Sequence, residues 1–469
     1  MSELPKGWVN QNLVEITTKI GSGSTPRGGQ DAYKAEGIPL IRSMNVRFSG
    51  LDAKGLAFID NEQADKLNAV TINDKDVLLN ITGASIGRVS VARDWAVGGR
   101  VNQHVCIIRP VFVDPLSDYL NYYLMTPKMQ DYINSNESGA TRQALTKAKV
   151  ESLSVPIAPL PEQKRIVEKL DEVLAQVDAI KARLDGIPDL LKRFRQSVLA
   201  SAVSGKLIGN TLDFQSTLVG DPWSHKVTAP KHWKLYEFKK AVKIIGGSQP
   251  PKSEFRDEDG EGLIRLIQIR DYKSDKFRVY IPIEKAKRFC SGQDIMIGRY
   301  GPPIFQILRG LEGAYNVALM KAEPLIGELN KEYLYRFLQN PKLFNYIDAG
   351  SDRTAGQAGV NKKFLESYPI FVPPLSEQQE IVRLVDQYFA FADTIEVQVK
   401  KAQARVDNLT QSILAKAFRG ELVPQNDDDE PADKLLERIA QARKEAEALA
   451  KAAKKVEAAK KRAANKARV

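Results

Sequence analysis

The chain has 469 residues, 43% of them hydrophobic, and a formal net charge of +11, so it can build more than one folded module and is compatible with an anionic partner. Two cysteines, Cys106 and Cys290, give neither a disulfide framework nor a zinc-ligand spacing and fit a reducing compartment. No apolar run approaches the roughly 20 residues that cross a membrane, and the first residues do not resemble a signal peptide, so we expect a cytoplasmic protein.

Residues 1–158 predict a first globular module of mixed strands and helices. Short β-type runs are separated by polar turns that contain glycine. Arginine suits guanine O6 and N7, and asparagine or glutamine suits adenine N6 and N7, so these turns are candidates for reading DNA. At each position a solvated surface residue is the alternative. The candidates are Arg27, Arg42, Asn45, Arg47, Ser85, Arg88, Arg100, Asn102, Gln103, His104, Thr141, Arg142 and Gln143.

Residues 159–207 predict a first long helix. Its apolar residues alternate four and three apart, which is typical of a seam for a partner helix. A helix packed only on its own module is the alternative, for which a period of 3.6 and a wider apolar stripe would be typical. Gly186 and Pro188 predict a bend or a break in this helix. The seam residues are Ile166, Leu170, Val173, Val177, Ile180, Leu184, Leu191 and Phe194.

After a linker at 208–229, residues 230–372 predict a second module and residues 373–422 a second long helix. The second helix region repeats the first in an unbroken register, at an offset of 215 residues. Its seam residues are Ile381, Val385, Tyr388, Ile395, Val399, Val406, Leu409 and Ile413. The candidate DNA contacts of the second module are Gln249, Lys252, Arg265, Gln268, Arg270, Arg299, Tyr300, Asn316, Arg353, Thr354 and Gln357.

The two seams predict that the helices pair with each other. If they run antiparallel, the modules at their starts are related by an approximate two-fold rotation, as are the strands of duplex DNA. A fixed helical spacer between two sequence-reading modules follows from this arrangement. Because the modules differ in sequence while the helices match, the two DNA half-sites should differ.

Residues 423–469 predict a basic, Lys/Ala-rich helical tail. From 431 onward it holds 12 Lys and Arg against 5 Asp and Glu, a net +7, after an acidic DDDE at 427–430. Such a helix could pack on a partner subunit, attract phosphate without sequence preference, or simply be solvated.

Motifs for catalysis are missing from the sequence. There is no GxxxxGK[ST] phosphate loop, and GPPIF at 301–305 lacks the initial Asn or Asp of an adenine methyltransferase loop. Three histidines suggest no metal cluster, and no acid pair with a nearby lysine indicates a nuclease. We therefore expect neither catalytic nor metal-binding residues in this chain.

Several motifs together indicate a family: the doubled helix starts PLPEQ and PPLSEQ, the helix ends QSVLASAVSGKL and QSILAKAFRGEL, and LPKGW, GSGSTP, TGASIGRV and NQHVCIIRP in the first module. On these, over about residues 1–425, the chain resembles a specificity (S) subunit of a type I restriction-modification system. In the second module GRYGPPIFQILRG replaces the TGASIGRV pattern, so contact residues transfer less directly there.

The resemblance implies a mixed α/β (α+β) fold with two target-recognition domains, each followed by a long helix, the two helices forming an antiparallel coiled coil. It implies a non-catalytic subunit that reads an asymmetric bipartite site on double-stranded DNA and docks two methyltransferase (modification) and two restriction subunits. S-adenosylmethionine, ATP and Mg²⁺ would be held by those partners. Such a protein serves phage defence in the bacterial cytoplasm, associated with the nucleoid through DNA.

Two other functions remain open from the residues alone. A coiled-coil scaffold for protein partners would show no sequence-selective DNA retention even with its partners present. An enzyme acting alone would cut or methylate DNA as a purified chain. A DNA-reading subunit predicts instead that exchanging residues 1–158 changes one half-site and leaves the other.

Overall fold

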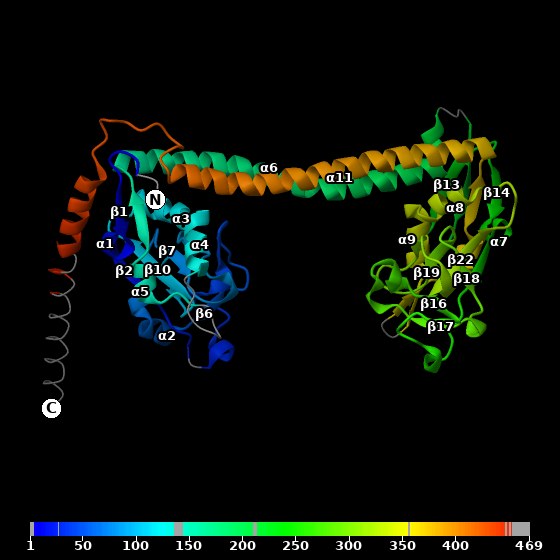
Figure 1. Ribbon diagram of the computed structural model, residues 1–469, viewed down its shortest axis with the longest axis horizontal. Helices are drawn as coiled ribbons and strands as arrows, with labels where there is room; N and C mark the ends of the chain where they lie inside the picture. The colour runs from blue at the N-terminus through cyan, green and yellow to red at the C-terminus, as the bar shows by residue number, and fades with distance from the viewer. Residues whose placement is uncertain are drawn as a thin grey trace. The chain divides into compact units, whose positions relative to one another are not determined.

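The computed structural model describes residues 4–26, 28–135, 144–209, 213–354, 357–445, 448–449 and 452. The chain divides into two compact units, one formed by residues 1–184 with 402–469 and the other by residues 185–401. Each unit contains one module and a part of both long helices (Figure 1). Within the described part of the chain, no helix is long and apolar enough to cross a membrane.

Unit 1 is built on a four-stranded antiparallel sheet in the order β2-β10-β7-β8, with a three-stranded sheet β6-β3-β9 beside it. Two short ribbons, β1-β11 and β4-β5, complete the strands. The strands are β1 (Val9–Asn12), β2 (Thr17–Ser22), β3 (Ile38–Ile41), β4 (Val46–Arg47), β5 (Gly50–Leu51), β6 (Ala57–Ile59), β7 (Val77–Asn80), β8 (Val89–Val91), β9 (Arg100–Val101), β10 (Val105–Pro110) and β11 (Ser154–Ile157). The helices are α1 (Leu13–Ile16), α2 (Asn61–Lys66), α3 (Leu116–Leu124), α4 (Pro127–Ser135) and α5 (Lys147–Glu151).

The central strands of this sheet are buried on both faces, which explains their nearly continuous apolar sequence. Successive side chains of a strand point to opposite faces. Leu79 and Ile108 therefore join the core shared with the long helices, whereas Leu78 and Ile107 join a second core under the three-stranded sheet. One sheet thus separates two hydrophobic cores within the unit.

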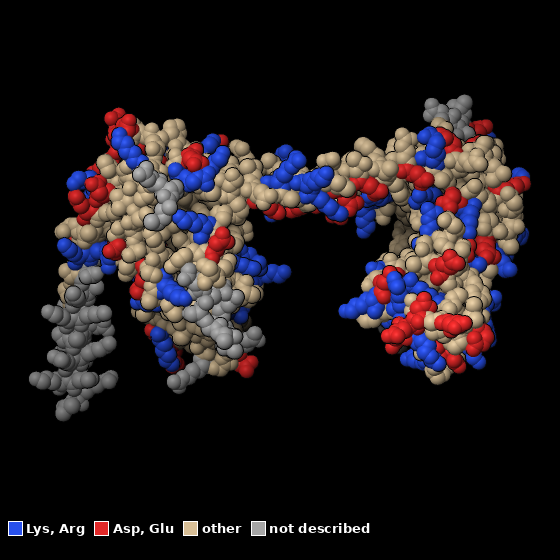
Figure 2. All heavy atoms as spheres, in the orientation of Figure 1, with Lys and Arg blue, Asp and Glu red and all other residues tan. Residues whose placement is uncertain are grey.

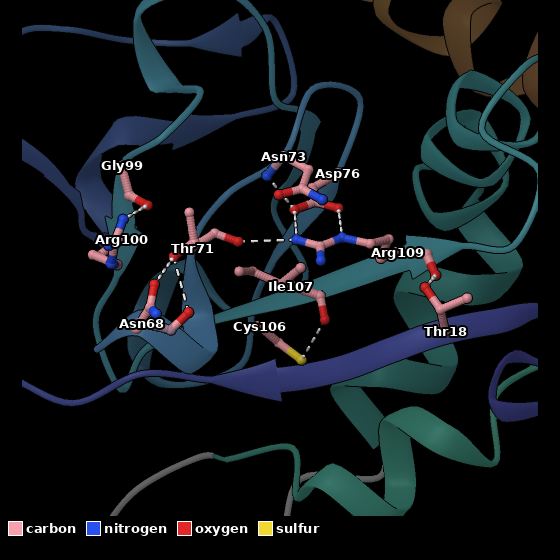
Figure 3. A network of polar contacts seen from close by, with 10 residues as sticks. All are labelled: Thr18, Asn68, Thr71, Asn73, Asp76, Gly99, Arg100, Cys106, Ile107 and Arg109. Atoms are coloured by element: carbon pink, nitrogen blue, oxygen red, sulfur yellow. Dashed lines mark hydrogen bonds and ion pairs between the residues drawn. The ribbon is translucent and has the colours of Figure 1, made fainter. Parts of the chain in front are cut away.

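An ion pair joins strand β10 to the turn that precedes β7. Asp76, which is buried, accepts two hydrogen bonds of 2.7 Å from Arg109 Nε and Nη2, and Arg109 Nη2 also donates to the Thr71 carbonyl at 2.9 Å (Figure 3). The backbone N–H of Asn73 donates to the same carboxylate. The bidentate geometry makes this a strong contact between β10 and the turn before β7.

Unit 2 repeats the architecture. Its sheets are β15-β22-β19-β20 and β17-β16-β21-β18, with two-stranded ribbons β14-β25, β12-β13 and β23-β24. The strands are β12 (Phe214–Val219), β13 (His225–Pro230), β14 (Lys234–Glu237), β15 (Val242–Gly246), β16 (Leu263–Ile267), β17 (Tyr280–Pro282), β18 (Phe289–Cys290), β19 (Ile295–Gly298), β20 (Gln306–Leu308), β21 (Gly313–Tyr315), β22 (Leu319–Pro324), β23 (Asp352–Thr354), β24 (Gln357–Gly359) and β25 (Pro369–Val372). The helices are α7 (Phe238–Ala241), α8 (Lys331–Leu338), α9 (Pro341–Ala349) and α10 (Lys362–Ser367).

The segment expected only as a linker forms the antiparallel hairpin β12-β13 in unit 2. Val219, Val227 and Ala229 from this hairpin are buried in the core of the unit. Exposed and half-buried residues alternate along most of β12, and the inward side chains of β13 at Val227 and Ala229 are buried, although the short apolar runs of the segment did not predict a hairpin.

The two long helices are α6 (Leu160–Val203) and α11 (Leu375–Ala417). In unit 1 the start of α6 packs beside the end of α11, where Lys181 pairs with Asp407 at 2.7 Å. In unit 2 the end of α6 packs beside the start of α11, where Arg195 pairs with Asp393 at 2.5 Å. The antiparallel pairing and the mixed α/β class are therefore confirmed (Figure 1).

Most of the predicted seam is buried or half-buried, but not all of it. Ile180 and Leu409 are 45% and 47% exposed, so they lie at the edge of the helix pair. Tyr388 is also partly exposed, although its ring packs edge-on against Phe194. Of the bend or break predicted near Gly186 and Pro188, a break is wrong, because α6 continues through both residues as one helix. A bend stays a prediction.

At the start of each long helix, a glutamate accepts a hydrogen bond from a tryptophan of the module that the helix follows. The indole N–H of Trp8 donates to Glu162 at 2.9 Å in unit 1, and that of Trp233 donates to Glu377 at 2.8 Å in unit 2. These contacts explain why the similar segments PKGW (5–8) and PKHW (230–233) occur together with the two Glu-Gln helix starts.

Both helices end at a glycine with positive φ, Gly205 at 75° and Gly420 at 72°. A Cβ on either glycine would lie about 2.5 Å from a proline of the opposite copy, Pro230 or Pro5. Each helix end therefore packs against the module at which the other helix begins.

The tail packs on its own unit. Residues 432–445 are helical, and Ala432, Leu435 and Ile439 are buried in the core of unit 1. Arg165 pairs with Asp429 at 2.6 Å, and the Ala432 N–H donates to the Gly7 carbonyl at 2.9 Å. One face of the start of the tail is therefore packed on unit 1, while most of its other described residues are exposed.

Candidate nucleic-acid interface

A polar cluster on unit 1 joins three of the turns that the sequence singled out. Thr25 donates to Gln103 Oε1, Gln103 Nε2 lies 3.0 Å from His104 Nε2, and His104 Nδ1 lies 2.5 Å from Thr82 Oγ1. The two ring nitrogens of His104 thus lie between Gln103 and Thr82, and which of them donates depends on the tautomer. This cluster of Thr25, Thr82, Gln103 and His104, hereafter the turn cluster, presents side chains that can donate and accept hydrogen bonds.

The backbone beneath the turn cluster is tightly held. Asn102 is buried, its N–H donates to the Ile41 carbonyl at 3.1 Å, and its Oδ1 accepts the His104 N–H at 3.0 Å. A Cβ on Gly23 would lie 1.8 Å from the Val101 carbonyl oxygen, so only glycine lets the neighbouring turn approach. The fixed backbone leaves Gln103 exposed at the tip.

Unit 2 builds the same turn with other side chains. The N–H of Asn316 donates to the Ile267 carbonyl at 3.1 Å, and its Oδ1 accepts the Ala318 N–H at 3.1 Å. Val317 therefore occupies the place of Gln103, and it is 41% exposed. Beside it, Tyr300 takes the place of Thr82, and the Arg299 guanidinium lies 5.1 Å from the Tyr300 ring.

Four of the predicted contact residues are buried within their own modules. Asn45 donates to the Asp52 carbonyl at 2.8 Å, and Arg100 donates to the Ala64 and Gly98 carbonyls. Arg100 also donates to the Gly99 carbonyl (Figure 3). Asn102 and Asn316 hold the two turns from inside. Because these four side chains make their hydrogen bonds within the modules, they hold loops in place in this structure, and a direct contact with bases stays a prediction.

Other predicted residues have side chains that already make contacts within their own module. Arg42 donates to the Gly55 carbonyl and lies 5.2 Å from the Tyr33 ring, and Ser85 accepts from Asn80. Three further side chains take part in ion pairs or capping: Arg47 with Asp52, Arg265 with Asp275, and Gln268 in the cap of the turn at Ile269–Tyr272. Arg270 lies 5.4 Å from the Phe277 ring and 4.0 Å from Asp271. A surface ion pair contributes little to stability, so Arg47 and Arg270, whose side chains are 45% and 52% exposed, can exchange theirs for phosphate. Arg265 is only 17% exposed and also lies 3.8 Å from the buried Asp271.

The side chains of the remaining predicted residues either make few polar contacts or are not described by the structure. Within the described part of the chain, Arg88 and Lys252 have no hydrogen bond or ion pair from their side chains, and Gln249 makes only a long one of 3.4 Å to Pro250. Arg27, Thr141, Arg142 and Gln143 lie outside the described residues. Arg353, Thr354 and Gln357 belong to the ribbon β23-β24, whose side chains are not described.

Charge alone does not outline an interface. Figure 2 shows Lys and Arg interspersed with Asp and Glu on the visible face of each unit. The interface is therefore inferred from the turns and not from a region of one charge.

The described residues offer little catalytic chemistry. Among them no group of three His, Cys, Asp or Glu side chains could hold a metal ion. Burial raises the pKa of Cys106 to about 12 and that of Cys290 to about 11, so both thiols stay protonated and unreactive.

Sequence reasoning missed Thr25, Thr82 and Val317 as parts of this surface. Asn102 and Asn316 are 214 residues apart, the same offset that relates LMTPKMQDYI to LQNPKLFNYI, so that offset would have set Val317 opposite Gln103. A valine did not indicate a DNA contact by itself, because the candidate residues were those whose side chains can form hydrogen bonds with bases.

Comparisons with a family model and with known proteins identify the same family. The family model of the type I restriction modification DNA specificity domain matches residues 5–189 and again residues 230–403. The chain is 32% identical over 441 residues to the EcoKI specificity subunit of the type I restriction enzyme of Escherichia coli K12, covering 90% of this chain and 91% of that protein. It is 36% identical over 440 residues to the EcoBI specificity subunit of Escherichia coli, covering 89% and 87%.

Two solved structures share its fold. The HsdS subunit from Thermoanaerobacter tengcongensis is 20% identical, with 90% of this chain and 98% of that chain covered and a TM-score of 0.55. A chain from a structure on complex assembly and conformational transition of the type I R-M system is also 20% identical, with 90% and 100% covered and a TM-score of 0.66.

Proposed function

Since the chain belongs to the family of type I restriction-modification DNA specificity subunits, we propose that its two modules read the two halves of an asymmetric, bipartite site on double-stranded DNA. One observation carries this proposal. The same buried asparagine turn occurs in both units but presents Gln103 in one and Val317 in the other. One fold with two different contact surfaces is what reading two different half-sites requires.

The helix pair supports a second part of the proposal, that α6 and α11 form the docking surface for two methyltransferase subunits and, through them, two restriction subunits. Each helix runs unbroken for more than 40 residues and contributes to the core of both units. On this proposal S-adenosylmethionine, ATP and Mg²⁺ act on the partner subunits, in the bacterial cytoplasm. This chain contributes sequence choice and no catalytic residue.

The test is to express the chain with its methyltransferase subunit in a host without DNA methylation and to map N6-methyladenine across the genome by single-molecule sequencing. A split, asymmetric motif is expected. Exchanging residues 1–158 for those of another family member should change one half of the motif only. A contiguous motif, or no added methylation from a folded complex, would favour a scaffold for protein partners instead.

A further inference from the structure

The turn that follows β9 in unit 1 and β21 in unit 2 has the same backbone connections in both. In each unit a parallel strand pair, β3-β9 or β16-β21, leads into an asparagine whose side chain caps the turn. The residue two positions after that asparagine accepts a backbone hydrogen bond at its carbonyl, His104 from Ile81 at 3.0 Å and Ala318 from Arg299 at 2.8 Å. The residue between them stands at equivalent places, Gln103 in one unit and Val317 in the other.

Val317 is 41% exposed and stands outside the hydrophobic cores that the described residues form. Its neighbours Tyr315 and Leu319 are both buried in one of these cores. A β-branched apolar residue at the tip of a tight turn gains nothing from the turn itself, since polar residues and glycine are favoured there. Its exposed side chain is therefore available to a ligand.

From this geometry we infer that Val317 reads a thymine by contact with its 5-methyl group, at the position where the first module uses the amide of Gln103. The inference rests on the proposed function, because it assumes that unit 2 reads a half-site. In the major groove the thymine methyl is the feature that an apolar side chain recognises, whereas an amide matches adenine N6 and N7. On this inference the neighbouring Tyr300 and Arg299, whose side chains lie against each other, supply the polar contacts to DNA in the same turn region.

The expected size of the effect follows from the apolar surface removed from water. One buried methyl or methylene group contributes about 0.8 kcal/mol, which corresponds to about a fourfold change in affinity. Deoxyuridine differs from thymidine by this methyl group alone. Replacing the thymine with uracil should therefore weaken binding about fourfold at one position of one half-site.

The experiment uses the full chain in complex with its methyltransferase subunits and duplexes carrying the mapped motif. Each thymine of either strand is replaced in turn by deoxyuridine, and affinity is measured for the wild type and for Val317→Ala. We expect one thymine at which uracil weakens the wild type about fourfold and leaves Val317→Ala unchanged. The matched control is Gln103→Ala, which should keep the full uracil effect at that thymine, and thermal melting should show that Val317→Ala is as stable as the wild type.

The outcomes separate the two proposals. If the wild-type complex selects the motif but no thymine shows a uracil effect that depends on residue 317, the inference about Val317 is wrong and the proposed function stands. If the motif contains no thymine, the inference is equally wrong. If a folded complex shows no sequence selection at all, the proposed function itself fails.

Discussion

Replacing Trp8 with phenylalanine removes the indole N–H that donates to Glu162 at 2.9 Å and leaves the carboxylate buried. A hydrogen bond to a charged group contributes about 1.5–3 kcal/mol, and the smaller ring loses some packing as well. We therefore expect unit 1 to lose about 2–3 kcal/mol near neutral pH, which lowers the melting temperature of a unit of this size by roughly 5–10 °C.

The loss should depend on pH. Burial raises the pKa of Glu162, and the nearby Asp429 adds to this, while the Trp8 N–H, the nearby Arg165 and a hydrogen bond with Gln425 lower the pKa. A carboxyl whose pKa is raised by folding contributes stability below its unfolded pKa and loses that contribution as pH rises through the folded value. Without the indole N–H the folded pKa rises further, so the variant should be penalised more at about pH 8 than at about pH 5.

Thermal melting of the two proteins at these pH values measures the difference, and hydrogen exchange of peptides near residues 5–16 locates it in unit 1. The matched control is Trp233→Phe, because Glu377 keeps a second partner in His232 Nε2 at 2.7 Å and is less buried. We expect a smaller loss in that variant at about pH 8. Equal losses in both variants, or a Trp8→Phe loss that does not change with pH, would refute the role assigned to the indole N–H.

Three further predictions follow from burial and hydrogen bonding. Leu170→Asp places a charge where the side chain is fully buried and should abolish assembly with the methyltransferase, whereas Leu409→Asp, at a position 47% exposed, should co-purify normally; equal behaviour in pull-down experiments would contradict the seam. Asp76→Ala leaves the Arg109 guanidinium without its buried partner and should destabilise unit 1 by about 3–5 kcal/mol in urea denaturation, and a loss under 1 kcal/mol would show that water replaces the carboxylate. Gln103→Ala should cost about 1–3 kcal/mol and relax one position of the methylation motif, while uniform weakening across sequences would mark a phosphate contact instead.

The repeat and the helix pair were predictable from the sequence because their signals are local. A seam residue every 3.5 positions specifies a partner helix wherever the chain goes, and two copies in one register specify which partner. The bounds of α6 and α11 lie within a few residues of the prolines and glycines that predicted them. Ile180 and Leu409 were predicted as seam residues but are exposed at the edge of the helix pair.

The candidate contacts were less predictable, because hydrogen-bonding capacity does not reveal exposure. Asn102 and Gln103 are adjacent and equally polar, yet the first is buried and the second exposed. What separates them is the pairing of β9 with β3, a strand some 60 residues earlier in the chain, whose Ile41 carbonyl takes the Asn102 N–H and turns its side chain inward.

The sequence by itself thus determined the repeat and the pairing of the two long helices, since periodicity and register are properties of the chain, whereas the antiparallel direction was implied only by the resemblance to the family. Tertiary structure alone decided that the tail begins by packing on unit 1, that Trp8 and Trp233 donate hydrogen bonds at the helix starts, and that Asn102 and Asn316 are buried while the residues after them are exposed. These depend on contacts between residues far apart in the chain, where burial is set by whichever strand or helix comes to lie against them.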